Sequence, residues 1–140
     1  MTARTTSLEL RVRYGETYQM GVVYHANYLI WCELGRTEHI RALGIPYRDI
    51  ERMGVRLAVA EATLRYHAPA RYDDVIRVET TLETVRSRHL DFSYVIALAA
   101  AGQRLASART ALVSLDMGGR VVAMPRELRD ALAAKDAATE

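Results

Sequence analysis

The hydrophobic and polar positions of the chain repeat with two different periods, which divide it into predicted elements. Apolar side chains alternate with charged ones over residues 8–14, a pattern that predicts a half-buried strand. From about residue 27 to residue 43 the apolar positions cover more than one side of a helix, so we expect a long helix buried on several faces. Gly44 is a typical C-cap for this helix, and residues 46–53 predict a short second helix that begins with proline.

The second half of the chain is predicted to be mostly strand. Alternating patterns predict four strands, at residues 55–66, 76–84, 90–98 and 104–117. The apolar phase of the first strand shifts near Val59 and Ala60, which predicts a bulge there. Gly118 and Gly119 are expected to form a tight hairpin that leads into a short strand at 121–123.

The order of these elements predicts the fold class. A terminal helix is expected to begin at Pro125, and residues 135–140 are expected to fray. One strand, one long helix and then four or five consecutive antiparallel strands favour an α+β fold in which the sheet wraps around the helix. Because the sequence contains no internal repeat and no linker, residues 1–140 are predicted to form a single domain.

Composition narrows the class of protein. Half of the 140 residues are apolar, which fits a packed core and argues against disorder. The net charge is only +2 and the arginines are interleaved with acids, so we expect no nucleic-acid-binding stripe. No apolar run approaches the roughly 20 residues that span a bilayer, and no signal-peptide core precedes the first strand, so a cytoplasmic protein is expected. Cys32, the single cysteine, lies in the helical pattern and is interpreted as a packing residue.

The stretch between the first strand and the long helix carries the candidate chemistry. A loop that feeds a helix N-terminus gathers free backbone N–H groups and the positive end of the helix dipole, which can polarise a carbonyl oxygen. We expect the N–H groups around Val23, Tyr24 and His25 to do this, with Gly21 allowing the backbone to approach a ligand closely. Asn27 is a further candidate for substrate binding, and as a good N-cap type it can instead serve only the helix.

The residues of this loop and of three later segments resemble a known family. The matching residues are Arg13-Tyr14-x-Glu16-Thr17, Met20-Gly21-Val22-Val23-Tyr24-His25-Ala26-Asn27-Tyr28, Glu33-x-x-Arg36-Thr37-Glu38, Tyr66-x-x-Pro69-Ala70-Arg71-Tyr72-Asp73-Asp74 and Val78-Glu79-Thr80. Over about residues 8–130 the chain resembles the hotdog-fold acyl-CoA thioesterases of the 4-hydroxybenzoyl-CoA thioesterase / YbgC type. The resemblance implies a five- to six-stranded antiparallel sheet around one long central helix, and homodimers or homotetramers with active sites at the subunit interface. It also implies hydrolysis of an acyl-CoA without a metal or redox cofactor.

One position departs from the family pattern. The resemblance implies a catalytic aspartate in the loop that attacks the thioester or activates water, and Tyr18 stands at that position. A phenol has an ordinary pKa near 10, against about 3.9 for an aspartate, so at neutral pH Tyr18 can donate a hydrogen bond but is a poor base. The family's mechanism therefore cannot be carried over unchanged. A rare or artificially introduced substitution at Tyr18 is a further interpretation.

Three other side chains can replace the missing carboxylate, and each also has a purely structural interpretation. His25 has the intrinsic pKa of a general base, or it only shapes the turn before the helix. Glu33 lies about 12 Å along the helix axis from His25. It matches a helix glutamate that a related branch of hotdog thioesterases uses as its carboxylate, or it only pairs with Arg36. Glu16 shares a face with the loop tyrosine if the backbone is extended, although a pair with Arg13 is favoured.

The resemblance also implies a place for the nucleotide end of coenzyme A. Arg86 and Arg88 flank a strand connection beside His89, where a basic pair meets the CoA phosphates in the resembling family, or they belong to a solvated turn. The sequence thus predicts an acyl-CoA thioesterase that needs no cofactor and binds no metal. The alternative is a catalytically weak or inactive protein of the same fold that binds acyl-CoA or an acyl carrier.

Overall fold

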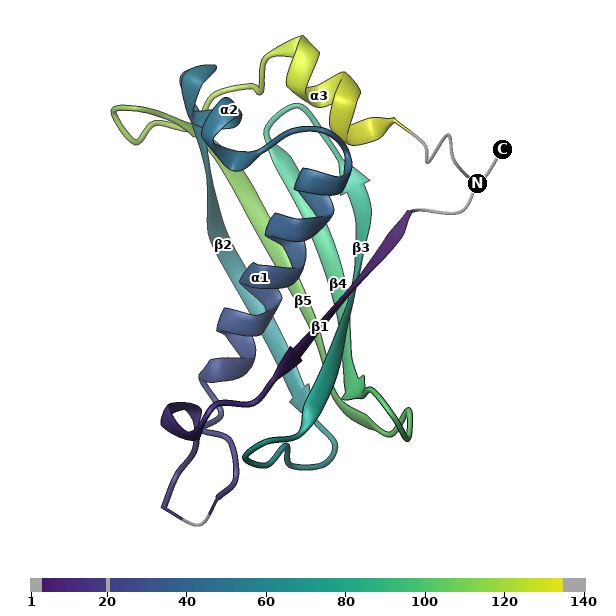
Figure 1. Cartoon of the computed structure of the whole chain (residues 1–140). Helices are drawn as coiled ribbons and strands as arrows, with labels where there is room; N and C mark the ends of the chain where they lie inside the picture. The colour runs from purple at the N-terminus through teal and green to yellow at the C-terminus, as the bar shows by residue number, and fades with distance from the viewer. Residues whose placement is uncertain (1–3, 20, 135–140) are drawn as a thin grey trace.

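The computed structural model describes residues 4–19 and 21–134, which form one antiparallel sheet and three α-helices. In chain order the elements are β1 (Thr5–Arg11), the 3₁₀ turn η1 (Tyr14–Glu16), α1 (Asn27–Ala42), α2 (Tyr47–Arg52), β2 (Val55–Tyr66), β3 (Val75–Val85), β4 (His89–Leu98), β5 (Arg104–Asp116) and α3 (Arg126–Ala133). The five strands lie in the order β1-β3-β4-β5-β2, and α1 crosses one face of the sheet (Figure 1). The predicted α+β architecture is therefore confirmed, with five strands.

The core lies between α1 and the sheet because the alternation predicted for the strands directs every second side chain toward the helix. On β4, Phe92, Tyr94 and Ile96 are buried, whereas the residues between them are partly exposed. Trp31 and Cys32 of α1 are fully buried against this layer. The interpretation of the single cysteine as a packing residue is thus confirmed.

At Gly35, α1 lies directly against β3 of the sheet. A Cβ atom placed on Gly35 would lie 2.9 Å from Val78 Cγ1 and nearer still to Thr80 Oγ1, both on β3. Contacts this short are closer than van der Waals separation, so the crossing point of helix and strand requires a residue without a side chain. Gly35 therefore sets the depth at which α1, and with it the loop before α1, lies on the sheet.

The opposite side of α1 leaves apolar surface exposed. Leu29, Ile30 and Leu34 of α1 are 40%, 48% and 45% exposed, and Val59 on β2 is 45% exposed. β2 is an edge strand, so one row of its main-chain groups lacks a neighbouring strand. Its register with β5 shifts between Val59 and Glu61, which confirms the predicted bulge.

Two sequence-based predictions differ from the structure, and a third lies outside the described residues. The strand predicted at residues 8–14 ends at Arg11, because Val12 exchanges main-chain hydrogen bonds with the loop at Asp73 and Asp74 instead. The strand predicted at 121–123 is reduced to a bridge between Leu115 and Val121. The fraying predicted for 135–140 concerns residues outside the described part of the chain.

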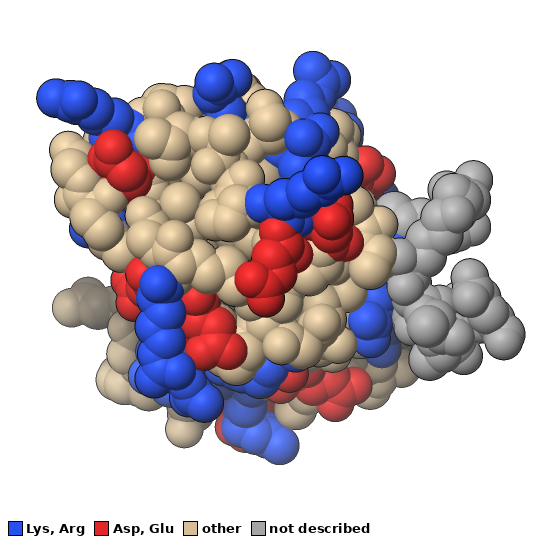
Figure 2. Space-filling view, turned by 90° about the horizontal axis from the view of Figure 1, so that it is seen from above, with Lys and Arg blue, Asp and Glu red and all other residues tan. Residues whose placement is uncertain are grey.

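The end of the molecule that carries α2 and α3 has a mixed charge. Figure 2 looks onto this end and shows basic and acidic side chains beside one another rather than a surface of a single sign. The interleaving of arginines and acids seen in the sequence therefore persists on this face.

Candidate active site

The loop between β1 and α1 is held in shape by its main chain. Tyr18 N–H donates to the carbonyl of Val22 at 2.8 Å, and Gly21 N–H donates to the carbonyl of Tyr18 at 2.9 Å. Gly21 has φ +84°, a left-handed conformation that favours glycine. Val23 N–H donates to the carbonyl of Ala70 at 2.9 Å, which attaches the loop to the connection between β2 and β3.

Glu16 joins this loop to the start of α1. Its buried carboxylate accepts hydrogen bonds from the Arg13 N–H at 2.8 Å and from Trp31 Nε1 at 3.0 Å, and the Arg13 guanidinium lies 3.5 Å away. Its main-chain carbonyl accepts from Tyr24 N–H and from Asn27 Nδ2, both at 2.8 Å. The favoured pairing of Glu16 with Arg13 is confirmed, and a carboxylate engaged in this way is not available as the base.

Asn27 has a role different from the one expected for a cap. It is the first residue of α1, the N-cap position is Ala26, and no side chain caps the helix. The amide of Asn27 instead donates inward to Glu16. Neither the capping role nor a side-chain contact with substrate is therefore supported for Asn27.

Tyr18 and His25 lie side by side. The Tyr18 hydroxyl is 3.1 Å from His25 Nδ1, and the ring of Tyr24 packs against both, with centroid distances of 5.1 Å to Tyr18 and 4.5 Å to His25. All three side chains are exposed. If His25 carries its proton on Nδ1, the phenol oxygen accepts it and Nε2 keeps a free lone pair that can take a proton from water.

Of the three backbone donors expected at Val23, Tyr24 and His25, only that of His25 is open, and Ala26 adds a further open donor. Two of the predicted N–H groups are used by the fold: Val23 N–H donates to Ala70, and Tyr24 N–H donates to Glu16. Within the described residues, the N–H groups of His25 and Ala26 have no hydrogen-bond acceptor. The expectation is therefore corrected, because main-chain pairing of the loop occupies the earlier donors and leaves those nearest the helix.

A cavity of about 300 Å³ opens beside the start of α1. Its lining residues come from the loop, α1, the end of β2 and the connection after it: Val22, Val23, His25, Tyr28, Tyr66, His67, Ala68 and Pro69. The walls are mainly apolar and aromatic, as is typical of a pocket that accepts an acyl group or a pantetheine arm. Val23 therefore contributes its side chain to the cavity although its N–H is engaged elsewhere.

Two tyrosines that line this cavity had no role in the sequence-based reading. Tyr28 accepts a hydrogen bond from Ala70 N–H at 3.1 Å, and Tyr66 donates to the main-chain carbonyl of His25 at 3.0 Å. Burial raises the pKa of both phenols, so both stay protonated at neutral pH. Both tyrosines stand in segments that match the resembling family, and this match was the signal from which they could have been found.

Glu33 is not brought to His25 within one chain. It is exposed and lines a second cavity of about 280 Å³ together with Arg36, Leu57 and Val59. In the part of the chain that the structure describes, no ion pair joins Glu33 to Arg36, so the structural interpretation of Glu33 is not supported either.

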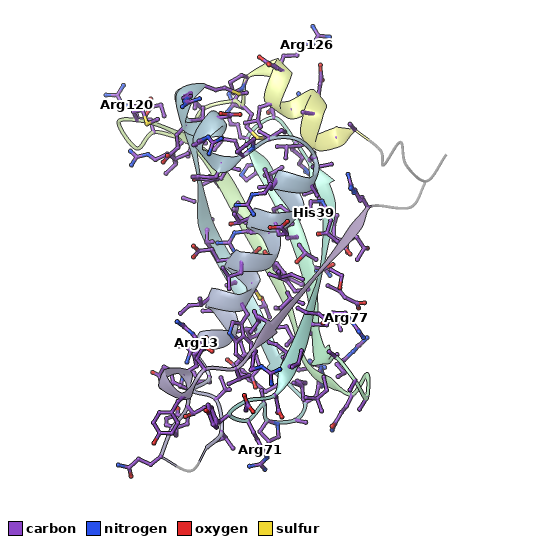
Figure 3. The ribbon with its side chains drawn as sticks, viewed as in Figure 1. Arg13, His39, Arg71, Arg77, Arg120 and Arg126 are labelled. Atoms are coloured by element: carbon purple, nitrogen blue, oxygen red, sulfur yellow. The ribbon has the colours of Figure 1, made fainter. Side chains whose placement is uncertain are left out.

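Arg86 and Arg88 lie at the opposite end of the sheet from His25. β3 begins beside the loop cluster and runs 11 residues to Val85, which places these arginines on the order of 30 Å away. The connection that carries them contacts the segment before α3, where Met124 N–H donates to Ser87 at 2.7 Å. Figure 3 shows Arg13 and Arg71 near the end of the molecule that carries the loop and Arg126 at the opposite end.

Two kinds of feature are absent from the described residues. None of the described helices is both long enough and apolar enough to cross a membrane. Among the same residues, no three histidine, cysteine, aspartate or glutamate side chains are grouped so that they could hold a metal ion.

Comparison with known proteins identifies the family. Residues 12–132 match the model of the Thioesterase-like superfamily. YneP of Bacillus subtilis, assigned to the acyl-CoA thioesterases, is 43% identical over 88 residues, which are 63% of this chain and 64% of YneP. The acyl-CoA thioester hydrolase YbgC of Escherichia coli O157:H7 is 36% identical over 84 residues, 60% of this chain and 63% of YbgC. This chain thus matches a little under two thirds of the length of each relative.

The solved structures agree with this result. The crystal structure of a 4-hydroxybenzoyl-CoA thioesterase with 4-hydroxybenzoyl-CoA superposes with a TM-score of 0.84 at 20% identity, covering 94% of this chain and all of that one. At this identity the similarity shows the fold, which is the expected hotdog architecture. Because the family model spans most of the sequence and the fold agrees with it, the chain belongs to the Thioesterase-like superfamily.

Proposed function

We propose that this protein hydrolyses acyl-CoA thioesters to the free acid and CoA, with His25 acting as the base in place of the loop aspartate. The observation that carries the proposal is the placement of His25. Its Nδ1 is 3.1 Å from the Tyr18 hydroxyl, and its ring lines the cavity beside two open N–H groups. The names of the relatives support the substrate class.

The chemistry follows from these groups. His25 Nε2 removes a proton from a water molecule, the oxygen attacks the thioester carbon, and the carbonyl oxygen becomes an oxyanion that accepts from the N–H groups of His25 and Ala26. Collapse of this tetrahedral intermediate breaks the carbon–sulfur bond, and the proton on His25 Nε2 passes to the CoA thiolate. The Nδ1 proton stays hydrogen-bonded to Tyr18. A positioned base contributes about 10²–10⁴-fold and each oxyanion donor about 10²–10³-fold to such a reaction.

The proposed reaction uses no metal or redox cofactor. The chain's single cysteine is buried and cannot form an intramolecular disulfide, which is in keeping with the cytoplasmic location that we propose.

We further propose a homodimer, the unit from which a homotetramer would be built. Leu29, Ile30, Leu34 and Val59 form an exposed apolar surface beside the open edge of β2, and a second copy would cover it. In such a dimer, Arg86 and Arg88 of the partner would be available to bind the CoA phosphates near His25. Sedimentation equilibrium should give twice or four times the chain mass, and a monomer at micromolar concentration would contradict the proposal.

The second candidate function is acyl-CoA or acyl-carrier binding without turnover. It is favoured by the phenol at Tyr18, because a phenol stabilises the imidazolium that forms on His25 less than a carboxylate would. Both candidates use the same cavity, so they differ only in rate.

The test is CoA release from a panel of short-chain, long-chain and aromatic acyl-CoAs, read with a thiol-reactive dye. Cys32 is buried and its pKa is raised to about 12, so the dye reports only the released thiol. The wild type should hydrolyse at least one substrate, and His25→Ala should lose about 10²–10⁴-fold. Tyr18→Phe should lose less, and Tyr72→Phe, with an exposed hydroxyl outside the site, should be unchanged. If the wild type releases no CoA and Tyr18→Asp does, the second candidate function, binding without turnover, would be supported instead.

A further inference from the structure

The hydroxyl of Tyr66 is placed to control a backbone donor of the site. Tyr66 is the last residue of β2, and its ring lines the same cavity as His25. The ring packs edge-on against Tyr28, with a centroid distance of 5.1 Å and an interplanar angle of 88°. Although Tyr66 is 46% exposed, its hydroxyl points back to the main chain and donates to the carbonyl of His25 at 3.0 Å.

That carbonyl belongs to the peptide unit that also carries the N–H of Ala26. The described residues contain no cis peptide bond. The carbonyl of His25 and the N–H of Ala26 therefore lie in one peptide plane and point in opposite directions. The first turn of α1 supplies a second donor to the same carbonyl, since Tyr28 N–H lies 3.3 Å from it. With two donors on its carbonyl side, the peptide plane is held and its N–H projects away from the helix.

The hydrogen bond also acts on the strength of the donor. A carbonyl that accepts hydrogen bonds polarises its own peptide group, which makes the N–H on the other side a better donor. Ala26 N–H has no hydrogen-bond acceptor among the described residues. The tyrosine hydroxyl therefore affects both the direction and the polarity of the open N–H that follows His25, a residue that lines the cavity.

From this geometry we propose that Tyr66 is a positioning residue, which holds the His25–Ala26 peptide so that Ala26 N–H donates to the thioester carbonyl oxygen. The inference rests on the proposed function, because the acceptor is the carbonyl of the acyl-CoA. It assigns to the end of β2 a role in the oxyanion site that is distinct from the base, His25, and from Tyr18.

The test uses Tyr66→Phe, which keeps the ring and its packing on Tyr28 and removes only the hydroxyl. The probe is an unreactive acyl-CoA analogue in which a methylene group replaces the thioester sulfur, with carbon-13 at the carbonyl. In the wild type the infrared carbonyl band of the bound probe should lie below its frequency in Tyr66→Phe. For the cleavable substrate, Tyr66→Phe should lower kcat about tenfold and leave KM within twofold. The expected loss is smaller than the roughly 10²–10³-fold cost of removing an oxyanion donor, because the Ala26 N–H is still present.

Tyr72→Phe is the matched control, since it removes an exposed tyrosine hydroxyl outside the cavity and should change neither measurement. An unshifted band in Tyr66→Phe, or a change confined to KM, would overturn the inference. If the wild type binds the probe with a lowered band that Tyr66→Phe raises, yet cleaves no thioester, the inference stands and the proposed hydrolysis fails. The two proposals can therefore fail separately.

Discussion

Gly35→Ala tests whether the depth of α1 on the sheet is set by the missing side chain at this position. In an isolated helix the change would be stabilising, because alanine is favoured over glycine by about 1 kcal/mol in a helix interior. In this protein the added methyl group would lie 2.9 Å from Val78 Cγ1 and nearer still to Thr80 Oγ1. Both neighbours are 0% exposed side chains on a central strand, so neither can rotate into free space.

The two effects can be weighed against each other. Overpacking of a core by one or two methyl groups costs typically about 1–3 kcal/mol, and two contacts below van der Waals distance place this site at about 3 kcal/mol. Subtracting the helix preference leaves a net loss of about 2 kcal/mol in the free energy of unfolding. For a chain of this size that corresponds to a melting temperature lower by about 6 °C.

Urea and thermal unfolding of Gly35→Ala measure this loss. Gly15→Ala is the control, because a Cβ atom at Gly15 meets nothing within 4 Å, and its stability should stay within about 0.5 kcal/mol of the wild type. Thr80→Ala in the Gly35→Ala background removes the nearest atom and should recover about 1 kcal/mol as a coupling energy. A Gly35→Ala variant as stable as the wild type, or more stable, would refute the close-approach argument.

Three further predictions concern the core. Burial lowers the pKa of His39 below its ordinary 6.5, so the unfolded chain binds the proton first as the pH falls. The free energy of unfolding should therefore decrease as the pH drops below about 6.5. His39→Gln should reduce this pH dependence, and an unchanged pH dependence would contradict the assignment. Tyr28→Phe leaves the buried Ala70 N–H without its acceptor and should cost about 1–3 kcal/mol in urea unfolding, with Tyr14→Phe neutral. Because the pKa of Cys32 is raised to about 12, the thiolate fraction of this residue at pH 8 is roughly 10⁻⁴. A maleimide should therefore label Cys32 only after unfolding, and rapid labelling of the native protein would show that α1 opens.

The predicted elements agree with the structure where a period of two or of 3.6 is sustained. The long helix begins at Asn27, as the pattern predicted, and the strands β3, β4 and β5 lie within a residue of their predicted bounds. The bulge at Val59 was visible because a single extra residue reverses the side to which every following side chain points. Short elements at the ends of these patterns, such as the bridge at Val121, depend on tertiary pairing that a local pattern does not contain.

The candidate site was predictable only in part. The pairing of Tyr18 with His25 concerns residues close in sequence, and both were candidates from the start. Of the three predicted donors only His25 N–H is open, because Val23 and Tyr24 form hydrogen bonds with Ala70 and Glu16 that depend on how three segments meet. Tyr66 is distant from His25 in the sequence, and no periodicity links a strand end to a helix start.

The main-chain turn at Tyr18 has an evolutionary consequence. Its N–H and carbonyl form the turn with Val22 and Gly21, and its exposed side chain contacts His25 and Tyr24. A change of side chain at this position leaves the folding of the loop intact. Aspartate and tyrosine codons differ by one base, so a single mutation can remove the carboxylate and a single reversion can restore it. Lineages that carry this scaffold can therefore exchange a carboxylate for a phenol beside His25, and exchange it back, without a variant that fails to fold.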